Sequence, residues 1–168
     1  MIRRAECDLS PLLVLIVSIA LLGSCATVPM APKNESEAAK QLEVPPGRAL
    51  IYVYRPTIMG TITLVNVDVN EQVLGAMPVQ SFFVIEVAPG YFRVFARMDP
   101  GSIDAYFAKG RAFSTMTGIA KAGERYYVRL NYSTGALLDP VGISLQQVDE
   151  QRARSSMTDT RLIRHVKL

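Results

Sequence analysis

Few side chains in this 168-residue chain have the chemistry for catalysis or for metal binding. His165 is the only histidine and lies three residues from the C-terminus, and the two cysteines are Cys7 and Cys25. Nucleophilic catalysis of the serine type needs a base that a third group positions, and a chain end holds such geometry poorly. One histidine also leaves a transition-metal site short of ligands. We therefore expect no catalytic residue, no metal site and no cofactor, and hence not an enzyme.

The acidic residues add little to this picture. Asp68, Asp99 and Asp104 are spaced irregularly and match no calcium-binding loop. Glu86 interrupts the apolar stretch Ser81–Val87 (SFFVIEV). A carboxylate there either faces solvent or lies in a cleft beside a second acid, as some hydrolases require. We favour the solvated position and keep a hydrolase with a carboxylate site as the least favoured hypothesis.

Two stretches repeat a pattern that suits ligand binding. In Tyr91–Met98 (YFRVFARM) and Arg125–Tyr132 (RYYVRLNY), alternate side chains point to opposite faces if both stretches are strands. If the two strands share a sheet, guanidinium groups and rings would line one surface, which suits carboxylates, phosphates or sugars. We call this the Arg/aromatic face; it comprises Tyr91, Arg93, Phe95, Arg97, Arg125, Tyr127 and Arg129. The favoured alternative is a solvated face whose arginine stems cover the rings.

Cys25 stands at the end of a leader-like segment. Arg3 and Arg4 precede an apolar run over 11–23, and small residues Gly23 and Ser24 follow it. A basic start, an apolar core of about 7–15 residues and a small-residue exit are typical of a secretory signal peptide. The run is shorter than the roughly 20 apolar residues of a spanning helix. An uncleaved anchor is the alternative, which Pro29 and Pro32 disfavour because they would break a continuing helix.

The tetrapeptide Leu22-Gly23-Ser24-Cys25 resembles the lipobox of bacterial lipoproteins. The resemblance implies cleavage between Ser24 and Cys25, a thioether-linked lipid on Cys25, and acylation of its new amino terminus with a fatty acid such as palmitate. Several acyl chains anchor a protein stably, where one would not. Ala26 after the cysteine resembles an outer-membrane address, with the protein facing the periplasm. The alternative is a cysteine that stands there by chance.

This interpretation divides the chain into a signal peptide (1–24), a lipidated cysteine with a flexible tether (25–47), and a folded domain with its tail (48–168). The tether segment Ala26–Gly47 is polar and has four prolines and no aromatic residue, so it buries too little apolar area to offset its ordering entropy. As a flexible coil it would span about 25 Å. Glu35–Glu43 could form two helical turns within it, but a coil is favoured. The mature chain would hold no free thiol, and its net charge of +3 argues against nucleic-acid binding.

Short strands separated by Gly/Pro turns dominate the domain. Strands are expected over 49–55, 61–69, 73–75, 81–87, 91–98, 113–120, 125–132 and 141–148, with a tight turn at Asn70-Glu71. The pattern predicts an all-β fold, a small β-sandwich of about 7–8 strands with an Ig-like or PEGA-like arrangement.

The tail after these strands has helical signals. Asp149 is a good N-cap for a short C-terminal helix. Farther on, Leu162, Ile163 and Val166 would share one helical face that packs on the edge of the sandwich, with Arg161, Arg164 and Lys167 opposite. A partner-binding tail is the alternative.

Several motifs together resemble a group of bacterial lipoproteins described only as a domain of unknown function. They are Tyr54-Arg55-Pro56, the stretch VNVDVNEQVLG, Val87–Tyr91 (VAPGY) and Ala122–Arg129 (AGERYYVR). The resemblance covers about residues 48–150 and implies a β-sandwich in the cell envelope, without an activity. A weaker similarity links VDVNEQVLGAMP to envelope domains of the PEGA type, in which Asp-Gly stands where this chain has Asn70-Glu71.

The leading hypothesis is therefore a lipid-anchored envelope protein with a non-catalytic binding or structural role. Its expected partners are the membrane and either envelope proteins or cell-wall polymer. The alternative is an assembly subunit of an envelope machine.

Overall fold

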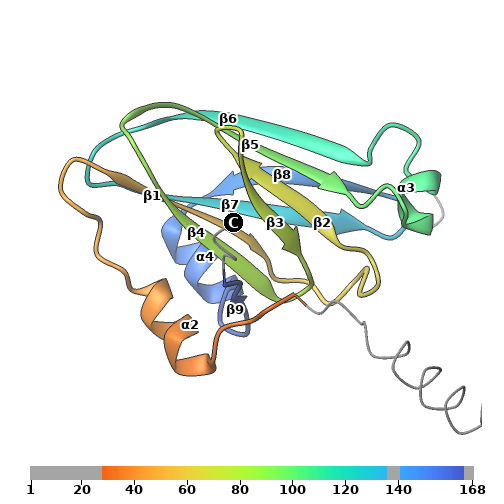
Figure 1. The fold of residues 1–168 in the computed structure, drawn as a ribbon, viewed down its shortest axis with the longest axis horizontal. Helices are drawn as coiled ribbons and strands as arrows, with labels where there is room; N and C mark the ends of the chain where they lie inside the picture. The colour runs from red at the N-terminus through yellow and green to blue at the C-terminus, as the bar shows by residue number, and fades with distance from the viewer. Residues whose placement is uncertain (1–27, 136–140, 165–168) are drawn as a thin grey trace, which may run out of the picture.

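The chain folds as two facing β-sheets with short helices, which is the small β-sandwich class that the sequence predicts (Figure 1). The computed structural model describes residues 28–135 and 141–164. One sheet has five strands in the order β8-β7-β1-β4-β9, and the other has four in the order β3-β2-β5-β6. The strands are β1 (Ala49–Arg55), β2 (Val65–Val69), β3 (Gln72–Met77), β4 (Ser81–Val87), β5 (Gly90–Met98), β6 (Phe113–Ala120), β7 (Arg125–Ser133), β8 (Gly142–Val148) and β9 (Arg161–Leu162).

Strand β1 is the centre of the five-stranded sheet. It pairs antiparallel with β4 and parallel with β7, and all seven of its residues are buried. A strand that is covered on both faces reads as a continuous apolar run instead of an alternating one, which explains the sequence ALIYVYR. The inward residues Ile51 and Val53 lie between the two sheets, whereas Tyr52 and Tyr54 lie on the outer face of their sheet.

The four-stranded sheet contains the predicted hairpin. Asn70 and Glu71 have φ angles of 50° and 67° and join β2 to β3. Positive φ at both central residues is the conformation that twists a two-residue turn in the same sense as its strands. On β2, Val65, Val67 and Val69 are buried, as the alternation predicts. The strand begins at Val65 and not at Thr61, because residues 57–63 form a loop whose carbonyls bind a buried arginine described below.

Two hydrophobic cores hold the layers together. The main core fills the space between the sheets and includes Phe83, Phe92, Met98 and Leu130. The second core lies on the outer face of the five-stranded sheet, where helices α2 (Lys33–Lys40) and α4 (Glu150–Ser156) cover it (Figure 1). Its members are Ala39, Leu50, Tyr52, Tyr54, Phe82, Tyr127, Ala153 and Met157.

The prediction of a flexible tether is wrong for residues 28–47. Ala31 is fully buried and its N–H donates to the Leu162 carbonyl at 2.8 Å. Ser36 and Ala39 point from α2 into the protein, and the Tyr52 hydroxyl donates to the Ala39 carbonyl at 3.0 Å. Small side chains at these positions let the helix approach the sheet closely, so a polar segment packs without large apolar residues of its own.

The C-terminal part confirms one of two predictions and contradicts the other. Asp149 caps α4 by accepting from the Arg152 N–H at 2.8 Å, which confirms the predicted cap and helix. The predicted helical stripe at Leu162 and Ile163 is wrong, because β9 runs extended and parallel to β4. Ile163 is buried at this sheet edge by extended pairing, and Val166 and Lys167 lie outside the described residues.

Within the described residues, β9 brings the number of strands to nine, where the sequence predicts seven or eight. A short helix, α3 (Ile103–Phe107), was also not expected. Strand β5 ends at Met98, as predicted, and Asp99-Pro100-Gly101 follows it. The Ser102 side chain then caps α3 by accepting from the Ala105 N–H at 3.2 Å. Across residues 28–135 and 141–164, no helix is both long and apolar enough to span a bilayer.

Candidate functional site

The Arg/aromatic face does not exist as one surface. Strand β5 belongs to the four-stranded sheet and β7 to the five-stranded sheet. The outward side chains of the two strands therefore lie on opposite sides of the sandwich. The prediction required that the strands share a sheet, and the alternation of side chains within a strand carries no information about which sheet the strand joins.

The β5 half of the predicted face is an open, solvated surface. Tyr91 is 65% exposed, Arg93 and Arg97 are exposed, and Phe95 is partly covered by Phe113, with 6.3 Å between the ring centroids. A guanidinium nitrogen of Arg93 lies 3.4 Å from a Glu71 carboxylate oxygen. This half matches the solvated alternative.

The β7 half lies at the other side, against α2, α4 and the chain that leads to β1. Tyr127 is only 3% exposed and stacks on Tyr52, with 5.0 Å between ring centroids and an interplanar angle of 16°. The Arg125 guanidinium donates to the Leu42 carbonyl at 2.9 Å, and Arg129 is half-buried. Of the predicted residues, Tyr127 thus lines a pocket. Arg125 holds residue 42 against the sheet and lies close enough to Tyr52 and Tyr127 to act on their hydroxyls electrostatically.

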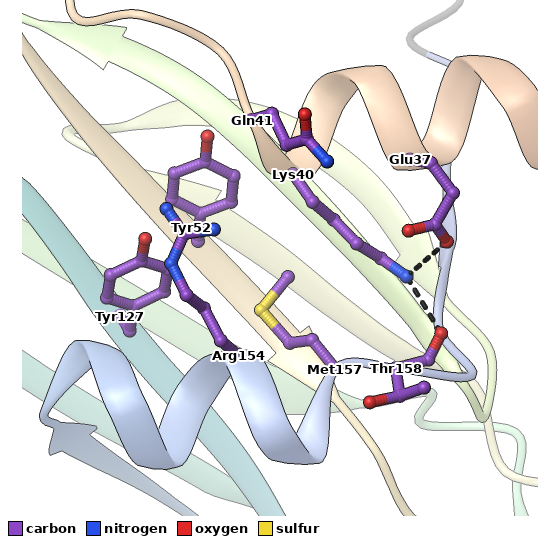
Figure 2. Close-up of a pocket in the computed structure, with 8 residues that line it drawn as sticks. All are labelled: Glu37, Lys40, Gln41, Tyr52, Tyr127, Arg154, Met157 and Thr158. Carbon is purple, nitrogen blue, oxygen red and sulfur yellow. Dashed lines mark hydrogen bonds and ion pairs between the residues drawn. The ribbon is translucent and has the colours of Figure 1, made fainter.

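That pocket has a volume of about 170 Å³ and lies between α2, α4 and the five-stranded sheet (Figure 2). We call it the α2–α4 pocket. The stacked rings of Tyr52 and Tyr127 form its back, as Figure 2 shows, with α2 on one side and α4 on the other. Its lining residues are Glu37, Lys40, Gln41, Tyr52, Tyr127, Arg154, Met157 and Thr158.

Both cations of the pocket are fixed by neighbouring groups. The Lys40 ammonium donates to a Glu37 carboxylate oxygen at 2.8 Å and to the Thr158 carbonyl at 2.9 Å. The Arg154 guanidinium donates to the Glu150 carboxylate at 2.7 Å, one helical turn away. The bond between Lys40 and Thr158 thereby connects α2 to the end of α4. The ammonium and the guanidinium are both fixed in position beside the pocket.

The tyrosine hydroxyls are kept neutral by their surroundings. Burial raises the pKa of Tyr127 to about 12, and the charge of Glu150 adds to this effect. Burial also raises the pKa of Tyr52. The hydrogen bond from Arg154 lowers the pKa of Glu150, so the carboxylate stays ionised opposite two neutral hydroxyls.

The arrangement suits recognition more than proton transfer. The Tyr52 hydroxyl donates to the Ala39 carbonyl and has the Arg125 guanidinium as a hydrogen-bonding neighbour. The Tyr127 hydroxyl donates to Glu150 at 3.3 Å and retains acceptor lone pairs. Arg154 retains N–H groups beyond those on Glu150. With charges of both signs, the pocket fits a small polar ligand that carries donors and acceptors, such as a peptide or amino-sugar segment.

Sequence reasoning found only Tyr127 among the lining residues. Lys40 and Glu37 lie in the segment predicted to be a tether, and Arg154 follows the predicted cap without any distinguishing pattern. The one available signal was the alternation of Tyr52 and Tyr54 with Ile51 and Val53 in β1, which indicates a second covered face.

A second unusual feature is a buried arginine at the α3 end of the sandwich. Arg55 has no exposed surface, and its guanidinium donates to the carbonyls of Thr63 at 2.7 Å, Gly60 at 2.8 Å and Met59 at 3.0 Å. It lies 5.3 Å from the centre of the Tyr132 ring. Burial lowers the pKa of Arg55, so the carbonyls and the ring stabilise a charge that the interior disfavours.

Arg55 fixes a loop beside α3. The Tyr132 hydroxyl donates to the Asp104 carboxylate at 2.6 Å, and the Thr63 hydroxyl donates to the same oxygen. Loop 57–63 and α3 are thus joined through Asp104. Apolar side chains that project from these two segments are exposed: Ile58, Met59, Ile62, Ile103, Tyr106 and Phe107, which we call the α3-end apolar set.

The remaining predicted residues are placed as follows. Glu86 is exposed on β4, which agrees with the solvated position and not with a carboxylate enclosed in a cleft. Within the described ranges, no group of histidine, cysteine, aspartate or glutamate side chains is arranged to hold a metal ion. Ser24, Cys25 and His165 lie outside the described residues.

Comparison with known proteins gives a family but no activity. A family model described as "Protein of unknown function (DUF2846)" matches residues 45–141. The chain is also 26% identical over 145 residues to an uncharacterized protein of Haemophilus influenzae, covering 85% of this chain and 79% of that relative. The matched residues include β1–β7 and therefore most of both sheets.

Proposed function

Because this chain belongs to the DUF2846 family, whose description names no activity, we propose a function from its own residues: a lipid-anchored protein of the bacterial cell envelope that acts by binding and not by catalysis. The observation that supports a binding role is the α2–α4 pocket, where the side chains of Tyr52, Tyr127, Lys40 and Arg154 converge. The proposed ligand is a peptide or amino-sugar segment of cell-wall polymer.

The anchoring part of the proposal comes from the leader. Leu22-Gly23-Ser24-Cys25 stands at the end of an apolar run and precedes the folded domain, so lipid on Cys25 would join the domain to a membrane. Ala26 favours the outer membrane as the destination, with the domain in the periplasm. Several acyl chains on one residue would make this attachment stable.

Mass analysis of the N-terminal peptide from the native membrane protein tests the anchor. The expected peptide begins at Cys25 and carries the mass of a diacylglycerol group and an amide-linked acyl chain. The Cys25→Ser variant provides the control, because it should lack both groups and leave the membrane fraction. A peptide that begins at Met1, or an unmodified Cys25, contradicts the proposal.

Sedimentation with purified peptidoglycan sacculi tests the pocket. The double variant Lys40→Gln/Arg154→Gln removes both cations while leaving polar side chains of similar length, and we expect it to lose most of the wild-type binding. The matched control is Arg93→Gln/Arg97→Gln on the opposite side of the sandwich, which removes the same charge. Equal binding by both double variants, or no binding by the wild-type protein, contradicts a role for the pocket.

The α3-end apolar set favours a second candidate, an assembly subunit of an envelope machine. Exposed apolar side chains held on a rigid support are typical of protein interfaces, and the Arg55 contacts supply that support. Crosslinking in intact membranes should then join this protein to a neighbour, and Ile62→Asp/Tyr106→Asp should abolish the product. Crosslinking that yields only monomers excludes this candidate.

A further inference from the structure

We infer that the β3 edge of the sandwich lies against the surface of a lipid bilayer, with lipid covering an apolar groove beside Val28; this rests on the proposed acylation of Cys25. The groove has a volume of about 280 Å³ and separates the first described residues from β3. Its apolar lining comes from Val28, Pro29, Val73, Leu74, Ala76 and Ile163.

The length of chain between the anchor and the domain decides how close the bilayer must be. Cys25 precedes Val28 by three residues, and three fully extended residues span at most about 11 Å. The chain is then fixed, because the Arg164 N–H donates to the Pro29 carbonyl at 3.0 Å and Ala31 pairs with Leu162. A domain of about 100 residues has a radius of gyration of about 13 Å, so a lipid on Cys25 holds the side of the domain around Val28 against the membrane.

The surface around Val28 has the composition that such contact requires. Val73 is 72% exposed although it is apolar, and Leu74 and Ile163 form the buried floor of the groove. The space beside Gly75, which also lines the groove, is open, since a Cβ added there would meet no atom within 4 Å. Arg164 stands at the rim with its guanidinium 2.7 Å from Glu35, where it can also contact lipid headgroups.

The position of β3 in its sheet supports the same orientation. Strand β3 is an edge of the four-stranded sheet and β6 is the other edge. An uncovered edge strand exposes unpaired backbone groups to other chains. Contact with the headgroup region would keep other chains away from the β3 edge. The N–H and C=O groups of β3 would still form hydrogen bonds there, with lipid headgroups and their water.

Fluorescent labelling of the acylated protein in vesicles tests the orientation. Because Cys7 leaves with the leader and Cys25 carries lipid in the proposed mature form, Val73→Cys introduces the one free thiol. Ile119→Cys on β6, 63% exposed in the wild-type protein, is the matched control at the opposite edge. Tyr106→Cys reports on the α3 end. Each protein is purified with its lipid and placed in vesicles of phosphatidylethanolamine and phosphatidylglycerol, and the thiol is then labelled with an environment-sensitive fluorophore.

We expect the label at residue 73 to shift its emission to the blue and to be quenched by lipids with a nitroxide near the headgroup. The label at residue 119 should show neither effect. Equal quenching at residues 73 and 119, or stronger quenching at residue 106, overturns the proposed orientation. If the acyl group is intact in the same sample, the proposed anchor is unaffected by that result. Absence of the acyl group overturns both. All three positions are exposed, so the substitutions leave the cores intact.

Discussion

At the scale of single residues, Arg55 shows how a charge in the interior can organise a surface. Its guanidinium replaces its hydration with three carbonyls of loop 57–63, those of Met59, Gly60 and Thr63. Removing the guanidinium takes this donor away from all three carbonyls, although the Gly60 carbonyl still accepts from the Thr63 N–H at 3.0 Å. An unsatisfied buried polar group costs more than a hydrogen bond contributes.

We predict that Arg55→Ala lowers the free energy of unfolding by about 3 kcal/mol. This value is the upper end of the range for hydrogen bonds to a charged group. Arg55→Lys should recover only part of the loss, because an ammonium cannot reproduce the planar fork. Urea denaturation measures both. Arg97→Ala, at an exposed position on β5, should change stability by less than about 0.5 kcal/mol; a similar loss in both alanine variants would contradict the assigned role of Arg55.

Tyr127 gives a pH dependence at the same scale. Its pKa in the folded protein is about 12, above its ordinary value of 10.0. A raised pKa means that folding favours the neutral hydroxyl, so this contribution to stability is complete below pH 10 and is lost as the pH rises through about 12. Burial also raises the pKa of Tyr52 and the pKa of Tyr54.

The wild-type protein should therefore lose stability between pH 10 and pH 12, and Tyr127→Phe should lose less over that interval. Denaturation at a series of pH values measures the difference. Tyr91→Phe, at a position that is 65% exposed, is the control and should follow the wild-type profile. A Tyr127→Phe profile parallel to that of the wild type would show that Tyr127 is not the group responsible.

At the scale of elements, the β2–β3 hairpin has a turn residue that fits its conformation poorly. Glu71 has a φ of 67°, in the left-handed region that costs a residue with a Cβ roughly 1–2 kcal/mol. Its carboxylate contacts Arg93 at 3.4 Å, but both side chains are exposed, so this pair contributes little.

Glu71→Gly should raise the free energy of unfolding by about 0.5–1 kcal/mol, since relief of the strained backbone exceeds the extra entropy of glycine in the unfolded chain. Thermal or urea denaturation measures the change. Glu71→Ala loses the same ion pair but keeps the Cβ, and should give no stabilisation. If glycine is no more stable than alanine at this position, backbone strain is not the cause.

At the scale of the whole molecule, the packing of residues 28–47 makes the N-terminal segment part of the domain. Helix α2 covers Tyr52 and Phe82 together with α4, and the stretch before it pairs with residues 162–164 at the end of β9 and just after it. Residues 28–47, which composition assigns to a tether, are therefore part of the packed domain.

Hydrogen exchange distinguishes a packed segment from a tether. The amides of Ala31 and Ser36 donate to the carbonyls of Leu162 and Pro32, so we expect them to exchange far more slowly than in the denatured protein. Ala39→Glu places a charge beneath α2, where Ala39 is 6% exposed, and should abolish this protection. Ala38→Glu on the exposed side of α2 should preserve it. Rapid exchange of both amides in the wild-type protein would restore the tether interpretation.

The sequence by itself determined the local features. The strand segments of β4, β5, β6 and β7, the turn at Asn70-Glu71 and the cap at Asp149 were predicted because each depends on neighbouring residues: alternation, positive φ or a side chain that reaches the next turn. The class of fold followed from the succession of such strands, and the family resemblance pointed to the same class.

Only the tertiary structure decided which strands share a sheet and what covers each face. Residues 91–97 and 125–129 have the same alternating pattern, yet they lie on opposite sides of the sandwich, because strand order depends on the summed pairing energy of distant segments. The α2–α4 pocket draws its residues from 37–41, 52, 127 and 154–158. No local pattern joins these positions, since their proximity arises only when two helices bury the second face of one sheet.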